Sequence, residues 1–252
     1  MKVVTGKLFK EMVLCGANTL HNNHPEIDAL NVFPVPDGDT GTNMSLTFSA
    51  GAKEIEGMDS NNIGEISKKL SKGLLMGARG NSGVILSQIF RGVSMALQGH
   101  EEADAVLWAQ ALESGAKVAY KAVMRPVEGT ILTVIRESSE AVVKYAKPGM
   151  EIEDVFSYFV KEAEASLERT PELLPVLKEV GVVDSGGAGL LLVFTGFLAG
   201  LAGETVDYVE IKSSDSAMNA VADIEGGEEG YGYCTEFIAV SYTHLRAHET
   251  SL

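Results

Sequence analysis

The chain has 252 residues, of which 45% are hydrophobic, and a formal net charge of −15. This charge argues against binding to nucleic acid or anionic membranes, and no apolar run reaches the roughly 18 residues of a membrane span. The length suffices for one full hydrophobic core with a short appendage. Cys15 and Cys234 lie in dissimilar surroundings, which predicts two free thiols in a reducing, cytoplasmic compartment.

Apolar residues recur at helical spacing along most of the chain. Such stripes cover residues 63–74, 107–118 and 155–167, and Gly and Pro separate roughly eight segments of this kind before Gly203. The residues alone therefore predict a compact all-α domain. After Gly203, residues 204–211 alternate like a strand, and residues 212–229 are polar and rich in Gly and Asp, as in a linker.

The first chemical motif is N-V-F-P-V-P-D-G-D-T-G-T-N-M, from Asn31 to Met44. Its prolines exclude a helix at the start, whereas the small polar residues after Asp39 suit the beginning of one. Two hard oxygen ligands, Asp37 and Asp39, beside helix N-terminal amides suit a divalent cation and the phosphates that it bridges. The alternative is a plain turn followed by a helix cap, and a calcium loop does not fit the spacing.

Three more Gly-rich or small polar segments each precede an apolar helical stretch. They are G-A-R-G-N-S-G from Gly77, R-P-V-E-G-T from Arg125 and V-D-S-G-G-A-G from Val183. The first is not a P-loop, because no Gly-Lys-Ser/Thr ends it, and its glycine spacing does not fit the dinucleotide fingerprint. Each alone indicates a helix cap, but together they predict helix N-termini that converge on one anion.

Four motifs in this order resemble those of the dihydroxyacetone kinase L-subunit (DhaL/DAK2) family, which includes the catalytic subunit of bacterial fatty acid kinase. The resemblance runs from about Leu8 to about Gly203 and is closer to the fatty acid kinase. It implies an antiparallel bundle or barrel of about eight helices over residues 1–203, followed by a strand and linker over 204–229. Residues 230–240 resemble the first strand of a middle domain, and 241–252 match nothing in the family, as a non-native tail would.

The resemblance also assigns roles to residues. It implies that Asp37 and Asp39 hold two magnesium ions, with Asn31 favoured over Asp28 as a third ligand, because relatives carry an Asp near the position of Asn31. Arg169 or Thr170 falls near a further nucleotide contact. The residues implied to bind ATP are Thr40, Gly41, Thr42, Asn43, Asn81, Ser82, Gly83, Thr130, Ile131, Asp184, Ser185 and Gly186.

The implied reaction is transfer of the ATP γ-phosphoryl group to the carboxylate of a fatty acid, which a separate carrier protein delivers. The alternatives are a small-polyol kinase of the dihydroxyacetone type and a nucleotide-binding regulatory module without turnover. A homodimer is possible in the full-length protein. His21, His24 and His100 fall in predicted loops, and no Ser-His-Asp or Cys-His arrangement indicates a covalent enzyme intermediate. Direct phosphoryl transfer is therefore expected.

Overall fold

The structure, a computed structural model, describes residues 2–211, so the predictions for 212–229, 230–240 and 241–252 lie outside the described residues. Eight long helices, two short helices and two short strands make up the described part. The long helices are α1 Gly6–Ala29, α2 Thr40–Glu56, α3 Ile63–Met76, α4 Gly80–Leu97, α5 Ala105–Ala122, α6 Ile131–Tyr145, α7 Ile152–Glu168 and α10 Ser185–Leu201. The remaining elements are β1 Val3–Thr5, β2 Glu102–Asp104, α8 Thr170–Leu173 and α9 Pro175–Val180.

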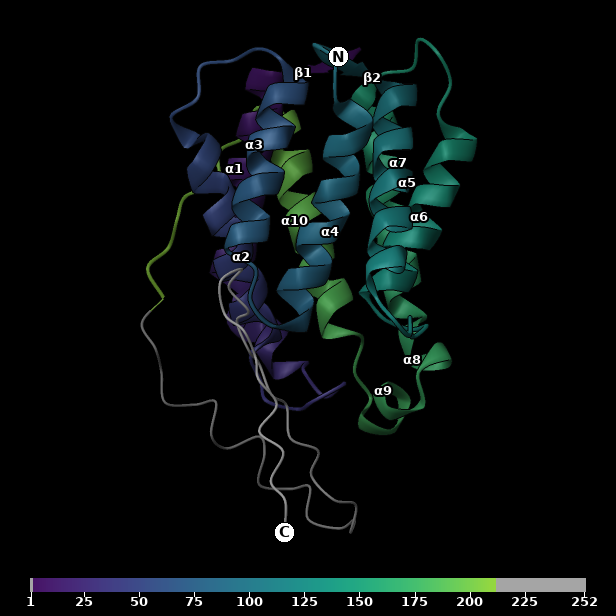
Figure 1. The fold of residues 1–252 in the computed structure, drawn as a ribbon. Coiled ribbons are helices and arrows are strands. Elements are labelled where there is room, and N and C mark those ends of the chain that lie inside the picture. Colours follow the sequence, from purple (N-terminus) through teal and green to yellow (C-terminus); the bar gives the residue numbers. More distant parts are fainter. Residues whose placement is uncertain (1, 212–252) are drawn as a thin grey trace, which may run out of the picture. The chain divides into compact units, whose positions relative to one another are not determined.

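The long helices run antiparallel to one another (Figure 1), and the order in which they pack closes into a ring. From α1 to α7, each long helix packs against the next along the chain, and α10 closes the ring by contacting both α7 and α1. Antiparallel pairing of β1 with β2, with Val4 opposite Ala103, ties the N-terminus to the α4–α5 connection at one end. The predicted all-α barrel of about eight helices is thus confirmed.

The core is aromatic and centres on α10. Phe197 lies 6.0 Å from Phe9, 5.9 Å from Phe90 and 5.7 Å from Phe194, measured between ring centroids. Each of these side chains is at most 2% exposed, and full burial of a Phe side chain contributes about 1.5–3 kcal/mol. Small residues let α10 approach α1 closely: a Cβ on Gly196 would lie 2.6 Å from the Cα of Gly16.

The strand predicted for residues 204–211 is not formed. The segment lies along α1 and pairs with side chains of that helix instead of with another strand. Asn18 donates to the carbonyl of Val206 at 2.7 Å. Asn22 accepts from the N–H of Val209 at 3.0 Å. The backbone polar groups of this extended segment are therefore hydrogen-bonded to side chains of α1 and not to a neighbouring strand. Within the described residues, no helix is long and apolar enough to cross a membrane.

Candidate phosphate-binding end of the barrel

Four helices that run in the same direction, α2, α4, α6 and α10, begin at the end of the barrel opposite the β1–β2 pair (Figure 1). Their first residues are Thr40, Gly80, Ile131 and Ser185, so the four starts are the four motifs singled out in the sequence. Each helix start carries about half a positive charge from its aligned peptide dipoles. This end of an acidic protein is therefore suited to anions.

The aspartates of the first motif crowd the start of α2. Gly38, between Asp37 and Asp39, has a φ of 66°, a left-handed conformation that favours glycine. Burial raises the pKa of Asp39, and the carboxylates of Asp37 and Asp28 raise it further, against a lowering by a hydrogen bond from Asn43. Such crowding of negative charge is relieved when a cation binds.

Asn31 completes this acidic cluster. Its Nδ2 donates to Oδ1 of Asp37 at 2.7 Å, and the residue is only 6% exposed. Its Oδ1 is buried and has no hydrogen-bond partner in the structure. Buried polar atoms are nearly always paired, so this oxygen is available to a ligand that prefers oxygen donors.

Asp28, the alternative third ligand, is engaged with the first turn of α2. Its Oδ1 accepts from the N–H of Thr42 at 2.9 Å, and its Oδ2 accepts from the hydroxyl of Thr42 at 2.7 Å. The carboxylate thus joins the end of α1 to the start of α2. A Cβ on the neighbouring Gly41 would collide with the carbonyl of His24, so only glycine fits where the two helices meet.

The start of α4 docks onto α2 through Thr47. The hydroxyl of Thr47 donates to the carbonyl of Asn43 at 2.7 Å and accepts from the N–H of Arg79 at 3.1 Å. A Cβ on Gly83 would collide with that hydroxyl, which explains the last glycine of the second motif. Ser82 reaches the carbonyl of Thr40 at 3.5 Å. Thr47 was not singled out by sequence reasoning, because a threonine inside a helix gives no signal.

The starts of α6 and α10 are joined by Asp184. It accepts from the N–H of Gly187 at 2.7 Å and also from the N–H of Ile131, so one carboxylate caps α10 and binds the first turn of α6. Burial raises its pKa to about 6, against a lowering by those two hydrogen bonds. Ser185 is 4% exposed, and Gly186 and Gly187 beside it are also buried, so the first turn of α10 is packed inside the protein.

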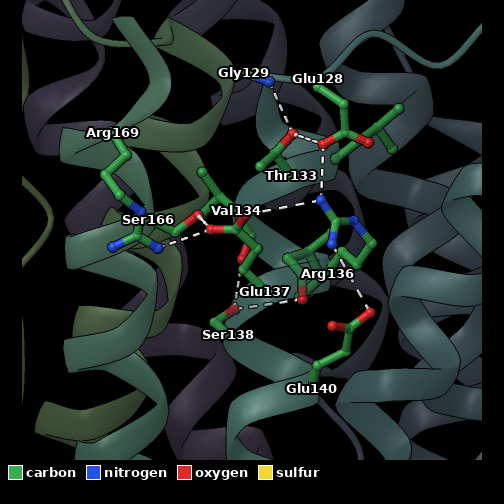
Figure 2. A network of polar contacts seen from close by, with 12 residues as sticks. Glu128, Gly129, Thr133, Val134, Arg136, Glu137, Ser138, Glu140, Ser166 and Arg169 are labelled. Carbon is green, nitrogen blue, oxygen red and sulfur yellow. Dashed lines mark hydrogen bonds and ion pairs between the residues drawn. The ribbon is translucent and has the colours of Figure 1, made fainter. Parts of the chain in front are cut away.

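Helix α6 is braced towards α7 by a second carboxylate (Figure 2). Glu137 accepts from Ser166 at 2.7 Å and from Arg169 at 2.8 Å. The adjacent Thr170, which is fully buried, accepts from the N–H of Asp184 at 3.1 Å. Arg169 therefore joins the end of α7 to α6, whereas Thr170 contacts the residue that leads into α10.

The prediction that His21 and His24 lie in loops is wrong, because both lie in α1. Pro25 has no N–H to offer the carbonyl of His21, and Nδ1 of His24 lies 2.7 Å from that oxygen in its place. The ring of His21 stacks on Tyr208, with centroids 4.2 Å apart. Burial lowers the pKa of His21, and the charge of His24 lowers it further. His100 lies outside the helices and strands, as predicted.

The surface has two hollows outside the four motifs. One of about 480 Å³ is lined by residues near the β1–β2 pair, including His100 and Glu102. The other, of about 260 Å³, lies between α5 and α6 and includes Lys117 and Arg136. Neither is lined by a predicted site residue. Among residues 2–211, no three His, Cys, Asp or Glu side chains form a ready metal cluster, so a cation here would need Asn31 or oxygens of its ligand.

Fold and site together define an antiparallel all-α barrel whose motif-bearing helix starts meet at one end. Residues 34–199 match the family described as the DAK2 domain. The chain therefore belongs to the DAK2 domain family, as its motifs predict.

Solved structures share the fold. The dihydroxyacetone kinase from C. freundii in complex with AMP-PNP and Mg2+ is 22% identical with a TM-score of 0.54, covering 76% of this chain and 33% of that one. The native form of the same enzyme is 23% identical with a TM-score of 0.57, covering 76% of this chain and 34% of that one.

Among curated relatives, protein YloV of Bacillus subtilis is 53% identical over 249 residues, covering 94% of this chain and 44% of that protein. An uncharacterized protein of Staphylococcus saprophyticus is 51% identical over 240 residues, covering 93% of this chain and 44% of that protein. The chain thus spans less than half the length of these relatives.

Proposed function

We propose that this domain binds ATP with magnesium and transfers the γ-phosphoryl group. The observation that carries the proposal is the crowding of Asp37 and Asp39 at the start of α2, where burial and neighbouring carboxylates raise the pKa of Asp39. The N-terminus of a helix attracts phosphates, but carboxylates at the same place repel them. A cation bound between the carboxylates and the phosphates removes this repulsion. That a solved structure with this fold was obtained with AMP-PNP and Mg2+ supports the choice of ligands.

Asp37, Asp39 and Oδ1 of Asn31 are the residues proposed to hold magnesium. The partnerless, buried Oδ1 favours Asn31 over Asp28, whose two oxygens already bind Thr42. When bound, two magnesium ions would neutralise the nucleotide phosphates. The protein's own part is to bind and orient those phosphates. The proposed contacts are Thr40, Gly41, Thr42, Asn43, Asn81, Ser82, Gly83, Thr130, Ile131, Asp184, Ser185 and Gly186.

For the acceptor we propose the carboxylate of a fatty acid, presented by a carrier protein. Large apolar side chains are exposed on the loops and helix ends around the proposed nucleotide site, which favours a protein partner over a free small molecule. They are Val35, Leu75, Met76, Val84, Met124, Val127, Leu173 and Val180. Met124 and Met76 are 98% and 80% exposed. The cytoplasmic location and the dimer of the full-length protein stay predictions.

The second candidate is a small-polyol kinase, which the likeness to dihydroxyacetone kinases favours. A full-length enzyme containing this domain should be assayed for ADP release with fatty acid plus carrier, with fatty acid alone and with dihydroxyacetone. Release that needs both fatty acid and carrier supports the proposal. Release with dihydroxyacetone alone replaces it with the polyol kinase, and ATP binding without release under any condition indicates a regulatory module.

A further inference from the structure

Glu128, in the loop between α5 and α6, accepts three hydrogen bonds on its carboxylate, and those from Thr133 and Arg136 can be followed in Figure 2. Tyr120 of α5 donates to Oε1 at 3.0 Å. Thr133 and Arg136 of α6 donate to Oε2 at 2.6 and 2.8 Å. Arg136 also donates from Nε to the Tyr120 hydroxyl at 3.1 Å, so the three partners are fixed to each other as well as to Glu128. The carboxylate therefore ties its loop to two helices.

The same cluster fixes the next two residues of the chain. The N–H of Gly129 donates to the hydroxyl of Thr133 at 2.8 Å. Gly129 has a φ of 80°, and a Cβ there would lie 2.8 Å from Cβ of Leu174, so this turn is tightly enclosed. Thr130 follows as the N-cap of α6, and its hydroxyl donates to the carbonyl of Val127 at 2.7 Å. The position of the α6 start thus depends on a loop that Glu128 holds.

Stability alone does not account for such an arrangement. The side chains of Glu128 and Arg136 are 48% and 33% exposed, and ion pairs at this exposure contribute little to folding. Burial raises the pKa of Glu128, but the hydrogen bonds from Thr133, Arg136 and Tyr120 outweigh it and leave the pKa below its usual value. The group is accordingly a carboxylate at neutral pH and a constant acceptor for its donors.

We propose that Glu128 is a positioning residue of the nucleotide site. It touches no phosphate itself. By holding Gly129 and Thr130 in one conformation, it keeps the start of α6 in place at the shared end of the barrel, so that the ordering of this loop need not occur when nucleotide binds. This inference rests on the proposed function, because it assigns Glu128 to the site that binds Mg-ATP.

The test compares Mg-ATP binding by calorimetry with the melting temperature of the 252-residue chain. Glu128→Ala should weaken binding about tenfold, the equivalent of one hydrogen bond to a charged group, and lower the melting temperature by no more than about 3 °C. Glu128→Gln should stay within about threefold of wild type, because its oxygen still accepts from α6 and its amide can donate to the Tyr120 hydroxyl. Glu140→Ala is the matched control: it removes a carboxylate 3.9 Å from Arg136 that contacts no part of the loop, and binding should be unchanged.

Several results would overturn the inference. Wild-type affinity in Glu128→Ala would do so, and so would an equal loss in Glu140→Ala, which would indicate a general effect of charge. If Glu128→Ala does not fold, Tyr120→Phe serves instead, and wild-type affinity in that folded variant refutes the positioning role. If the wild-type chain binds no Mg-ATP, the proposed site itself is wrong, which is a separate outcome.

Discussion

Removing the buried charge of Asp184 tests how the starts of α6 and α10 are held together. The pKa of this group is raised from 3.8 to about 6 by burial. The folded state therefore holds the proton more tightly than the unfolded state. Stability from this group is fully present below pH 3.8 and is lost as the pH rises through 6. About two pKa units at 1.36 kcal/mol each make that loss about 3 kcal/mol.

Asp184→Asn has no such titration, although its amide nitrogen cannot accept from the N–H of Ile131. Urea unfolding of both proteins between about pH 4 and pH 7.5 gives the difference in unfolding free energy at each pH. We expect the wild type to lose about 2.5 kcal/mol relative to the variant across this range, because a small part of the loss already falls below pH 4. Asp104→Asn is the control, because Asp104 caps α5 in the same way as Asp184 caps α10 but is exposed to solvent. A wild-type-minus-variant difference that stays constant with pH would refute the assignment of a buried, titrating carboxylate.

Three further outcomes are expected. Gly83→Ala should lower the unfolding free energy measured in urea titrations by about 1–3 kcal/mol, because the added Cβ collides with Thr47. Gly57→Ala is the control and should be nearly neutral, because no atom lies within 4 Å of its added Cβ. His21→Ala should leave the rate of phosphoryl transfer in the full-length enzyme within a few-fold of wild type, and a hundredfold loss without unfolding would reveal a general base. With carrier-bound fatty acid, that rate should be nearly flat between about pH 6.5 and 8.5, since a carboxylate is already ionised, whereas a steep rise would favour a hydroxyl acceptor.

Most of the fold followed from local sequence signals. Glycine, proline and aspartate mark the helix starts, and apolar spacing marks the helices between them, so a compact all-α domain with four motif-bearing helix starts could be predicted. Its arrangement as a barrel was implied only by the resemblance to the DhaL/DAK2 family. The helical state of His21 and His24 could not, because the adjacent asparagines and Pro25 are typical of a helix break. Tertiary packing overrides that signal: α1 continues because its far half contacts α2 and α10.

The contacts that hold the site together gave no signal in the sequence, although several of the residues that make them were singled out for other roles. Asp28 and Thr42 are 14 residues apart, and Thr170 and Asp184 are equally distant, so no periodicity links them. In the sequence, Glu128 is a polar residue in a predicted loop, and nothing there indicates its contacts with α5 and α6. For residues 204–211 the sequence did give a signal, the alternation typical of a strand. The prediction of a strand was wrong because the segment binds the surface of α1 and not another strand. Contacts of this kind depend on the folded arrangement and become visible only there.

The most direct test of the central claim is a calorimetric titration of ATP into the folded chain, with and without Mg2+. We expect binding that requires Mg2+ and that Asp37→Ala or Asp39→Ala abolishes while the helical circular dichroism stays at the wild-type level, because these side chains lie outside the core. The account is contradicted if folded protein binds no ATP. It is equally contradicted if binding persists unchanged without magnesium and without either carboxylate.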